Sequence, residues 1–569
     1  MIMNIDDLEG LDDATRKEVE ELQKVTREED GGDAFGKAYC SIGKIFREKN
    51  LPIEALKIFN KIEREDSPIW YADAQIEKGL TYYDLNQLEE SYQAFDEVKE
   101  SDGEFHYVMA QYGLGSLLIR DNDKNKALVS WRNIKGKGES LSVAKLKFKI
   151  GATLLKGDFS EYDEARQFFV ETLKYYPYES YCYQKICGLL LDLKLKAIGK
   201  KSLQLLDKTL ETVNILKLDF GTKSNENKSP ERKLAHYTNT SITNLLLEKN
   251  EDGSLPSSFR LNTINNVNDP SEGHLLVNYL EGIRESYFYA PDFDKSLHAF
   301  ISCFTFNHDS LNQFRLYGKE ANKEASGVSL VFKKEFFQLD SSLGGLSFLS
   351  LGNNIQNSDK DFFPLETNEQ SDKKKASEDK FRISRQPVMR CVYLDPVSGF
   401  AQLAQRNKLT FYREFGDENI GEESKAELEW LKYKNDIEKK ERTFSKSFAS
   451  LKAIYEELNK EKLKLDKVDL DAVEILLSEI LLPLKYLIKH SAFQEEQECR
   501  MVYVTSLDAP EVKIEHRKFL FVEYDAEVKE NLNKIYIAPA ATEYQLYLSW
   551  LLRDSNVKIE LSNNPYRQT

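Results

Sequence analysis

From residue 34 to about 215 the chain repeats a pattern of small and large apolar positions with a period near 36. Each unit has a glycine, a small residue twelve to fourteen positions later, and a large apolar residue four positions after that. The glycines are Gly43, Gly79, Gly115, Gly151 and Gly188; the small residues are Ala55, Ser91, Ala127, Ala165 and Ser202; the large residues are Phe59, Phe95, Trp131, Phe169 and Leu206. Small residues let two helices approach closely, and a large residue one turn later fills the gap between them. The pattern predicts roughly five antiparallel helix pairs stacked as a solenoid.

This small–small–large pattern, with Phe46 and Tyr82 at its aromatic position, resembles the tetratricopeptide repeat. The resemblance implies an all-α solenoid over 34–215, preceded by an N-terminal capping segment at 1–33. Arrays of this kind stack into a curved surface and usually bind a peptide, a protein partner or the chain's own second domain. A pure scaffold or a dimerisation element is an equal alternative, so a homo-oligomer stays open.

After a polar linker at 216–233 the pattern changes to short strand-like runs mixed with helices. Strands are expected at 234–238, 299–305, 327–332, 534–539 and 557–561. The pattern predicts an α+β domain with a mixed sheet over 234–567. Within it we expect a polar insertion at 356–380 and a helical insertion at 421–490, where glutamate and lysine are dense.

Composition narrows the classes of function. A chain of 569 residues is too long for one core, and its net charge of −16 disfavours broad binding to nucleic acid or to an anionic membrane. No apolar window is long enough to span a membrane, and no secretory signal is evident, so we expect a cytoplasmic protein without a membrane partner. The six cysteines are scattered, and the histidines lack the spacing of metal ligands, so no metal is expected.

Candidate chemistry lies at Glu496, Glu498 and Arg500, which occupy alternate positions leading into an apolar, β-branched run. Alternation at period two predicts that all three side chains share one face of an edge strand. A cation two residues from a carboxylate pair can hold one glutamate ionised, so that it acts on a ligand. The alternative is a solvated edge-strand face with a self-paired arginine.

Several short motifs occur with this one in a fixed order. They are His-Tyr-Thr at 236–238, Asn-Asp-Pro-Ser-Glu at 268–272, Cys-Phe-Thr at 303–305, Gln-Phe-x-x-Tyr-Gly at 313–318 and Glu-x-Glu-x-Arg at 496–500, with Ile-Tyr-Ile-Ala-Pro and Asn-Asn-Pro-Tyr-Arg near the end. Together they resemble the bacterial family called domain of unknown function 2971, which implies no settled activity. Their order is also similar to that of ADP-ribosyltransferases of the His–Tyr–Glu type, which implies NAD as a co-substrate.

The transferase resemblance implies roles for particular side chains. His236 would hydrogen-bond the nicotinamide-side ribose, Tyr317 would stack on the nicotinamide, and Glu498 would stabilise the positive charge that builds on the sugar. Glu496 would modulate Glu498, and Arg500 would serve as a counter-charge or phosphate ligand. The other residues assigned to cofactor binding are Tyr237, Thr238, Asn268, Asp269, Ser302, Thr305 and Gln313.

Each assignment has a plain structural alternative. His236 can be a hydrogen-bonded strand residue, Tyr317 can be core packing, and Asn268 and Asp269 are good turn formers whatever their chemistry. The leading hypothesis is therefore a repeat array that docks a protein partner, joined to an effector domain that is an NAD-dependent ADP-ribosyltransferase with a defence or toxin-like role. The alternatives are a non-catalytic adaptor, whose second domain binds a ligand or partner, and a hydrolase acting on nucleic acid.

Overall fold

A computed structural model describes most of the chain. The described residues are 11–138, 140–156, 161–218, 220, 231, 233–249, 256–264, 272–283, 298–320, 323–337, 382–416, 418–420, 423–516 and 518–566. The predicted polar insertion at 356–380 and most of the linker at 216–233 lie outside them. The chain forms two compact units, which we call the helical unit (Met1–Tyr175) and the sheet unit (Tyr176–Thr569).

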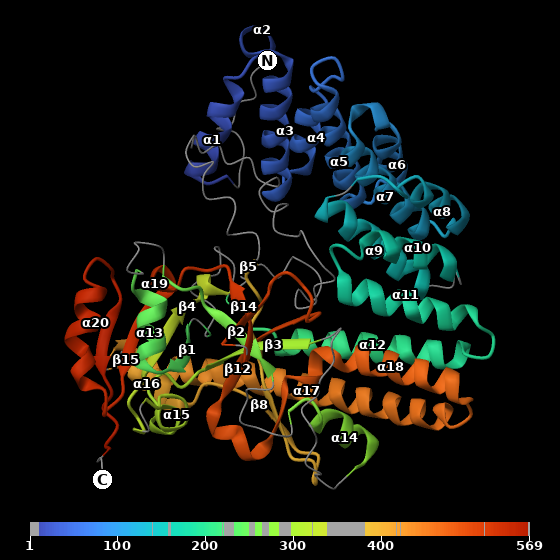
Figure 1. Cartoon of the computed structure of the whole chain (residues 1–569). Helices are drawn as coiled ribbons and strands as arrows, with labels where there is room; N and C mark the ends of the chain where they lie inside the picture. Colours follow the sequence, from blue (N-terminus) through green and yellow to red (C-terminus); the bar gives the residue numbers. More distant parts are fainter. Residues whose placement is uncertain are drawn as a thin grey trace. The chain divides into compact units, whose positions relative to one another are not determined.

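The helical unit consists of helices that pack in consecutive pairs (Figure 1). Its helices are α1 (Asp13–Gln23), α2 (Arg27–Asp30), α3 (Gly32–Glu48), α4 (Pro52–Phe59), α5 (Pro68–Asp84), α6 (Leu88–Asp96), α7 (Glu104–Arg120), α8 (Lys124–Arg132), α9 (Leu141–Lys156) and α10 (Tyr162–Thr172). From α3 onward each helix packs against its successor in the pairs α3–α4, α5–α6, α7–α8 and α9–α10. The prediction of N-terminal helices is confirmed.

In all four pairs the glycine of the first helix meets the large residue of the second. A Cβ placed on Gly79 would lie 2.8 Å from the Phe95 ring, and one on Gly151 would lie 3.1 Å from the Phe169 ring. The Phe59 ring lies closer still to a Cβ placed on Gly43, and the Trp131 ring lies closer still to one placed on Gly115. A side chain at Gly43, Gly79 or Gly115 would force the facing ring to shift, and one at Gly151 would be tight against it, so these positions favour glycine.

The turns between paired helices repeat as well. Asn50, Asn86 and Asn122 follow α3, α5 and α7, and each has a positive φ of 61° to 65°. After each of them a backbone N–H returns to a carbonyl five residues back, as from Leu51 to Phe46 at 2.8 Å. Asparagine tolerates the left-handed conformation that closes a helix in this way, so each turn is specified locally.

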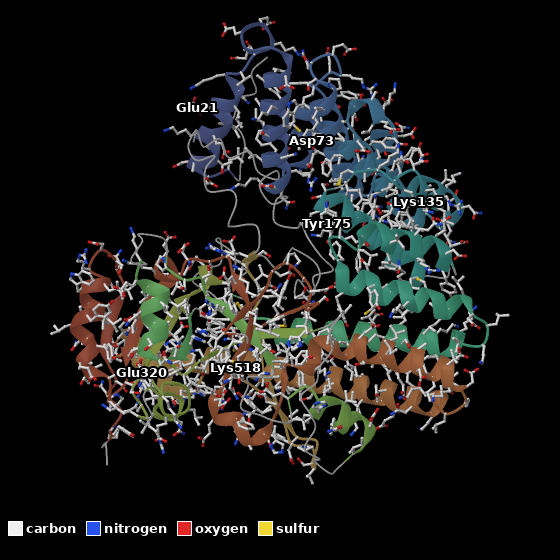
Figure 2. The ribbon with its side chains drawn as sticks, viewed as in Figure 1. Glu21, Asp73, Lys135, Tyr175, Glu320 and Lys518 are labelled. Carbon is white, nitrogen blue, oxygen red and sulfur yellow. The ribbon has the colours of Figure 1, made fainter. Side chains whose placement is uncertain are left out.

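Ion pairs connect α3 and α5, the first helices of the first two pairs. Lys44 on α3 lies 2.6 Å from Asp73 on α5, which is labelled in Figure 2, and Arg47 pairs with Glu77 on the same two helices. These side chains remain 15% to 39% exposed. We call these four residues the α3/α5 polar patch.

The sheet unit begins with two helices, α11 (Pro177–Leu191) and α12 (Lys196–Leu216), which sequence analysis assigned to the fifth repeat. They pack against α17 (Lys425–Lys462) and α18 (Lys467–Lys485), the two long helices of the predicted helical insertion. The Tyr178 hydroxyl donates to the Ile480 carbonyl at 2.6 Å. No described atom lies within 4 Å of a Cβ placed on Gly188, so this pair lacks the glycine–large contact of the other four.

The rest of the sheet unit is built on a mixed sheet, so the prediction of a mixed sheet in this half is confirmed. The strands are β1 (Lys233–Thr238), β2 (Arg260–Thr263), β3 (His298–Thr305), β4 (Val328–Lys333), β5 (Arg382–Ile383), β6 (Met389–Arg390), β12 (Glu498–Thr505), β13 (Val512–Glu515), β14 (Phe519–Tyr524), β15 (Leu532–Ile537) and β16 (Lys558–Leu561). Their order is β13-β14-β2-β3-β1-β4-β15-β16, with β12 between β3 and β6, and β5 beside β14. The β15–β16 and β14–β5 pairs are parallel, and the other pairs are antiparallel.

Smaller elements surround this sheet. They are α13 (Thr240–Leu247), α14 (Leu275–Glu281), α15 (Leu311–Tyr317), α16 (Lys408–Phe415), α19 (Val528–Asn531), α20 (Gln545–Leu551), a short sheet of β11 (Ile488–His490), β7 (Val392–Leu394) and β8 (Ala401–Leu403), and the 3-10 turn η7 (Ser491–Glu496). An aromatic core that includes Phe259, Phe304, Phe332 and Phe336 packs on the main sheet. Within the described part of the chain, no helix is long and apolar enough to cross a membrane.

Candidate functional site

Strand β12 carries the centre of the candidate site. It pairs with β3 along its whole length and with β6 at Cys499 and Arg500, so it is an internal strand. Glu496 lies outside it, in η7, and Gln497 between them has a φ of +47°. The predicted edge strand is thus internal. Glu498 and Arg500 share one face of it as predicted, but Glu496 does not, because the left-handed Gln497 ends the period-two alternation.

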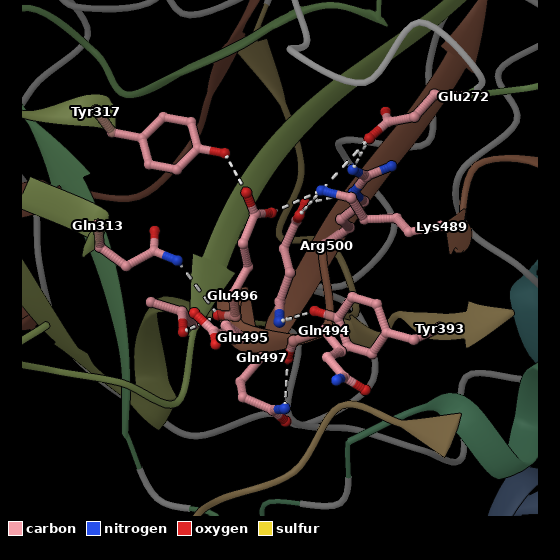
Figure 3. A network of polar contacts seen from close by, with 12 residues as sticks. Glu272, Gln313, Tyr317, Tyr393, Lys489, Gln494, Glu495, Glu496, Gln497 and Arg500 are labelled. Atoms are coloured by element: carbon pink, nitrogen blue, oxygen red, sulfur yellow. Dashed lines mark hydrogen bonds and ion pairs between the residues drawn. The ribbon is translucent and has the colours of Figure 1, made fainter. Parts of the chain in front are cut away.

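A turn brings Glu496 back to the other two residues (Figure 3). Lys489 from β11 donates to Glu496 Oε2 at 2.7 Å and to Glu498 Oε2 at 2.6 Å. Arg500 Nε donates to Glu498 Oε1 at 2.5 Å, and its Nη2 donates to Glu272 Oε1 at 2.5 Å. We call these five residues (Glu272, Lys489, Glu496, Glu498 and Arg500) the Glu498 network.

Backbone groups complete the network. Arg500 Nη1 donates to the Tyr486 carbonyl at 2.8 Å, and the Tyr393 hydroxyl accepts from the Glu498 backbone N–H at 2.7 Å. All five side chains of the network are buried, Glu498 being 4% and Arg500 0% exposed. A buried guanidinium with three acceptors is satisfied in the geometry that its fork requires.

The charges of the network shift one another's pKa values. Burial would raise the pKa of Glu498, but the charges of Arg500 and Lys489 hold it well below its usual range. Burial would likewise lower the pKa of Lys489, and the surrounding carboxylates raise it instead. At Glu272 burial prevails and raises the pKa of the carboxyl. Glu498 is therefore a fixed anion between two fixed cations.

His236 and Glu498 lie on opposite faces of the sheet. Ala235 is opposite Thr305 in β3, and Thr305 is opposite Glu498 in β12, so these three side chains share a face. His236 is one position further on, so its side chain is on the other face. Its Nδ1 lies 2.8 Å from the Cys303 carbonyl oxygen, its ring contacts Phe259, and burial lowers its pKa. The prediction that His236 and Glu498 meet around one ribose is therefore wrong.

Strand register also separates the other predicted residues. Thr238 and Ser302 are on the His236 face of their strands, whereas Tyr237 is on the Glu498 face. The Tyr237 hydroxyl donates to the Asn307 carbonyl at 2.7 Å and accepts from the Ser310 N–H at 2.8 Å. Tyr237 thus fixes the segment between β3 and α15. The predicted ligands Asn268 and Asp269 lie outside the described residues.

Three predicted residues gather at Glu496. The Tyr317 hydroxyl donates to Glu496 Oε1 at 2.9 Å (Figure 3). The Thr305 hydroxyl donates to the Glu496 carbonyl at 2.6 Å. Gln313 Nε2 lies 3.5 Å from the same carbonyl. Tyr317 is 37% exposed and holds a carboxylate, so here it serves as a hydrogen-bond donor.

A cavity of about 340 Å³ opens beside Glu496, between α15 and η7. Its polar lining is mixed in charge, with Arg315 and Lys319 opposite Glu324, Glu495 and Glu496. Glu496 thus lines this cavity, whereas Glu498 is not among its lining residues.

Sequence analysis missed two members of the network, Lys489 and Glu272. Lys489 directly follows the short apolar run Tyr486–Ile488 and precedes His490, so its position gave no clear signal of a buried charge. Glu272 ends the Asn-Asp-Pro-Ser-Glu motif but is 228 positions from Arg500, and nothing local indicates that contact.

A scan against protein-family models, a search of curated proteins and a search of solved structures each found no match. Among the described residues, no group of three or more His, Cys, Asp or Glu side chains is arranged to hold a metal ion. Residue geometry and the sequence pattern are therefore the basis for inferring function.

Proposed function

We propose that this chain is a non-catalytic adaptor. Its helical unit, a solenoid of tetratricopeptide type, docks a protein partner, and its sheet unit binds a ligand or a second partner. The observation that supports this proposal is the state of Glu498, which is 4% exposed and has both carboxylate oxygens engaged by cations.

ADP-ribosyl transfer requires a carboxylate that can approach the sugar as positive charge develops on it. Freeing Glu498 would leave Lys489 and Arg500 buried with fewer counter-charges, at a cost of about 3–5 kcal/mol for a broken buried pair. His236, the proposed ribose ligand, is on the far face of the sheet. The Glu498 network therefore fits a structural tie better than a catalytic centre.

Protein docking by the helical unit is supported by its repeated construction. The glycine–large contact recurs in four successive pairs, and stacked helix pairs of this kind form extended binding surfaces. The α3/α5 polar patch adds partly exposed charges of both signs to the first helices of two pairs. A partner with complementary charges could be recognised there.

Nicotinamide release from NAD by the purified full-length chain, with and without cell lysate, tests the absence of catalysis. We expect no release from the wild type or from a Glu498→Gln variant. The matched control is Glu456→Gln, at an exposed position on α17 outside the cavity. Release that is lost in Glu498→Gln, kept in Glu456→Gln and not explained by unfolding would overturn the adaptor proposal.

Docking is tested by exchanging charges within the α3/α5 polar patch. The double variant Lys44→Asp with Asp73→Lys keeps an ion pair but reverses the surface that a partner meets. The control is Lys57→Glu, on the exposed side of α4. Quantitative comparison of co-purified proteins should show a partner lost from the exchanged variant and retained by the control. Equal recovery by both would contradict docking at this patch.

A further inference from the structure

A second cavity, of about 240 Å³, lies in the sheet unit between α16 and strands β1, β4, β15 and β16. Strand register places its lining on one sheet face, since Val331 is opposite both Ala235 and Lys534, and Lys534 is opposite Lys558. Lys233, two positions before Ala235, shares that face. Helix α16 and the residue before its cap supply the facing wall through Arg406, Thr410, Arg413 and Glu414.

The lining carries an excess of positive charge, and we call it the cationic cavity. Its cations are Lys233, Arg406, Arg413, Lys534 and Lys558. The carboxylates are Asp309 and Glu414 in the lining, and Glu560, which lies 2.7 Å from Lys534. Among these residues five cations lie beside three carboxylates, in a chain whose net charge is −16. His308 adds no charge at neutral pH, because burial lowers its pKa to about 4.

Neighbouring contacts hold the two arginines in place. Arg406 Nη2 donates to Glu414 at 2.6 Å, its Nε donates to Thr410 Oγ1 at 3.2 Å, and its guanidinium lies 3.8 Å from the Phe411 ring centre. Arg413 Nη1 donates to the Asp309 carbonyl at 3.1 Å. Asp309 is itself fixed by hydrogen bonds of 2.6 Å from Ser562 and 2.7 Å from Asn564. These contacts reduce the conformational entropy that ligand binding would otherwise cost.

We propose that the cationic cavity binds the phosphate group of a small phosphorylated molecule. Cations from four separate stretches of the chain converge here, and their mutual repulsion is relieved by an anion bound between them. A phosphate monoester carries about two negative charges at neutral pH, so it suits a cavity lined mainly by cations. Arginine forks and lysine ammonium groups are the donors that suit phosphate oxygens.

The size of the cavity also fits this ligand class. About 10–15 Å³ of cavity volume is enough to hold one water, so a cavity of about 240 Å³ has room for more than a phosphate group alone. Part of an organic body can therefore enter with the phosphate. This inference rests on the proposed function in one respect: it names the ligand that the sheet unit of the adaptor binds.

Isothermal titration of the full-length chain tests the proposal with three probes: inorganic phosphate, ribose 5-phosphate and AMP, with adenosine as the unphosphorylated control. The cavity variants are Arg413→Gln and Lys558→Gln, which change an arginine 44% exposed in its side chain and an exposed lysine. Their matched controls are Arg442→Gln on α17 and Lys518→Gln beside β14, both exposed and outside the cavity.

We expect phosphate-bearing probes to bind and adenosine not to bind, with each cavity variant weakening binding about tenfold and the controls leaving it unchanged. Equal affinities for the three phosphorylated probes would support recognition of the phosphate group alone, and tighter binding of an organic phosphate would support added contacts to its body. No binding of any probe at millimolar concentration, or equal weakening by the controls, would overturn the proposal. Neither outcome bears on nicotinamide release or partner docking, so a failure here is distinguishable from a failure of the adaptor proposal.

Discussion

The Glu498 network and the cationic cavity occupy the same face of one sheet and are built from the same kinds of side chains. In the network, three carboxylates surround two cations, and all five groups are buried. In the cavity, five cations meet three carboxylates around open space. In the network each buried charge depends on its buried partners, so removing one destabilises the fold, whereas cations gathered around an opening can meet a ligand.

The largest effect is expected from removing Arg500, the cation of the network that contacts both Glu498 and Glu272. Arg500→Met would leave Glu498 and Glu272 buried without their shared guanidinium, so the free energy of unfolding should fall by about 3–5 kcal/mol. Urea denaturation followed by circular dichroism measures the change. Arg442→Met, at an exposed site on α17, should change stability by less than about 0.5 kcal/mol. A loss of under about 1 kcal/mol in Arg500→Met would show that the network is not a structural tie.

Acid should reduce the contribution of Glu498 to the free energy of unfolding. The native state holds the pKa of Glu498 below its usual range, so the unfolded chain takes up this proton at higher pH than the native one. The stability due to Glu498 is thus fully present above about pH 4.3 and is lost as the pH falls toward the native pKa.

Glu498→Gln should therefore cost about 2–3 kcal/mol at pH 7, less than Arg500→Met, because Glu272 and Glu496 still accompany the cations. Urea denaturation at a series of pH values measures the difference in unfolding free energy between this variant and the wild type, which should shrink below about pH 4. A difference that stays constant with pH would mean that the effect is steric. Glu495→Gln supplies the baseline, because its carboxylate lies outside the network.

A smaller effect is expected where the network meets solvent. Tyr317→Phe removes the 2.9 Å hydrogen bond to Glu496, and since Tyr317 is 37% exposed, water can replace part of it. We expect a loss of about 1 kcal/mol in the free energy of unfolding. Tyr412→Phe is the control, because the Tyr412 hydroxyl donates to Glu427 at 2.7 Å on the exposed side of α16, so this variant loses a phenol–carboxylate hydrogen bond outside the network. Equal losses in the two variants would mean that the position beside Glu496 has no special role.

The smallest effect on stability should come from the cationic cavity. Lys558→Gln removes one of several like charges, so the free energy of unfolding should change by less than about 0.5 kcal/mol, toward greater stability at low salt. Added salt screens the repulsion and should erase the gain. Thermal denaturation at low and high ionic strength measures it. A clear loss of stability would show that Lys558 takes part in packing rather than in an open site.

Local features of the fold could be predicted from the sequence. Gly43 and Phe59 belong to one repeat and meet within it, so their spacing alone predicts a helix pair. The strands follow from short β-branched runs in the same way, as for β3 and β15.

The site could be predicted only in part, because its geometry depends on long-range pairing. Glu498 and Arg500 were found from their spacing along one strand. The turn at Gln497 could not be foreseen, since a positive φ at glutamine has no sequence signature. The face on which His236 lies depends on the register between β1 and β3, and a shift of one residue would have reversed it.

The Glu272–Arg500 contact also constrains the order in which the chain folds during synthesis. The two residues are 228 positions apart, so at roughly 5–20 residues per second a ribosome takes about 10–45 s to make the second after the first. Until then the Glu272 carboxylate has no Arg500 to pair with. The helix pairs of the helical unit can close within one repeat of emerging, so the sheet unit is the part that would depend on a chaperone or on slow translation.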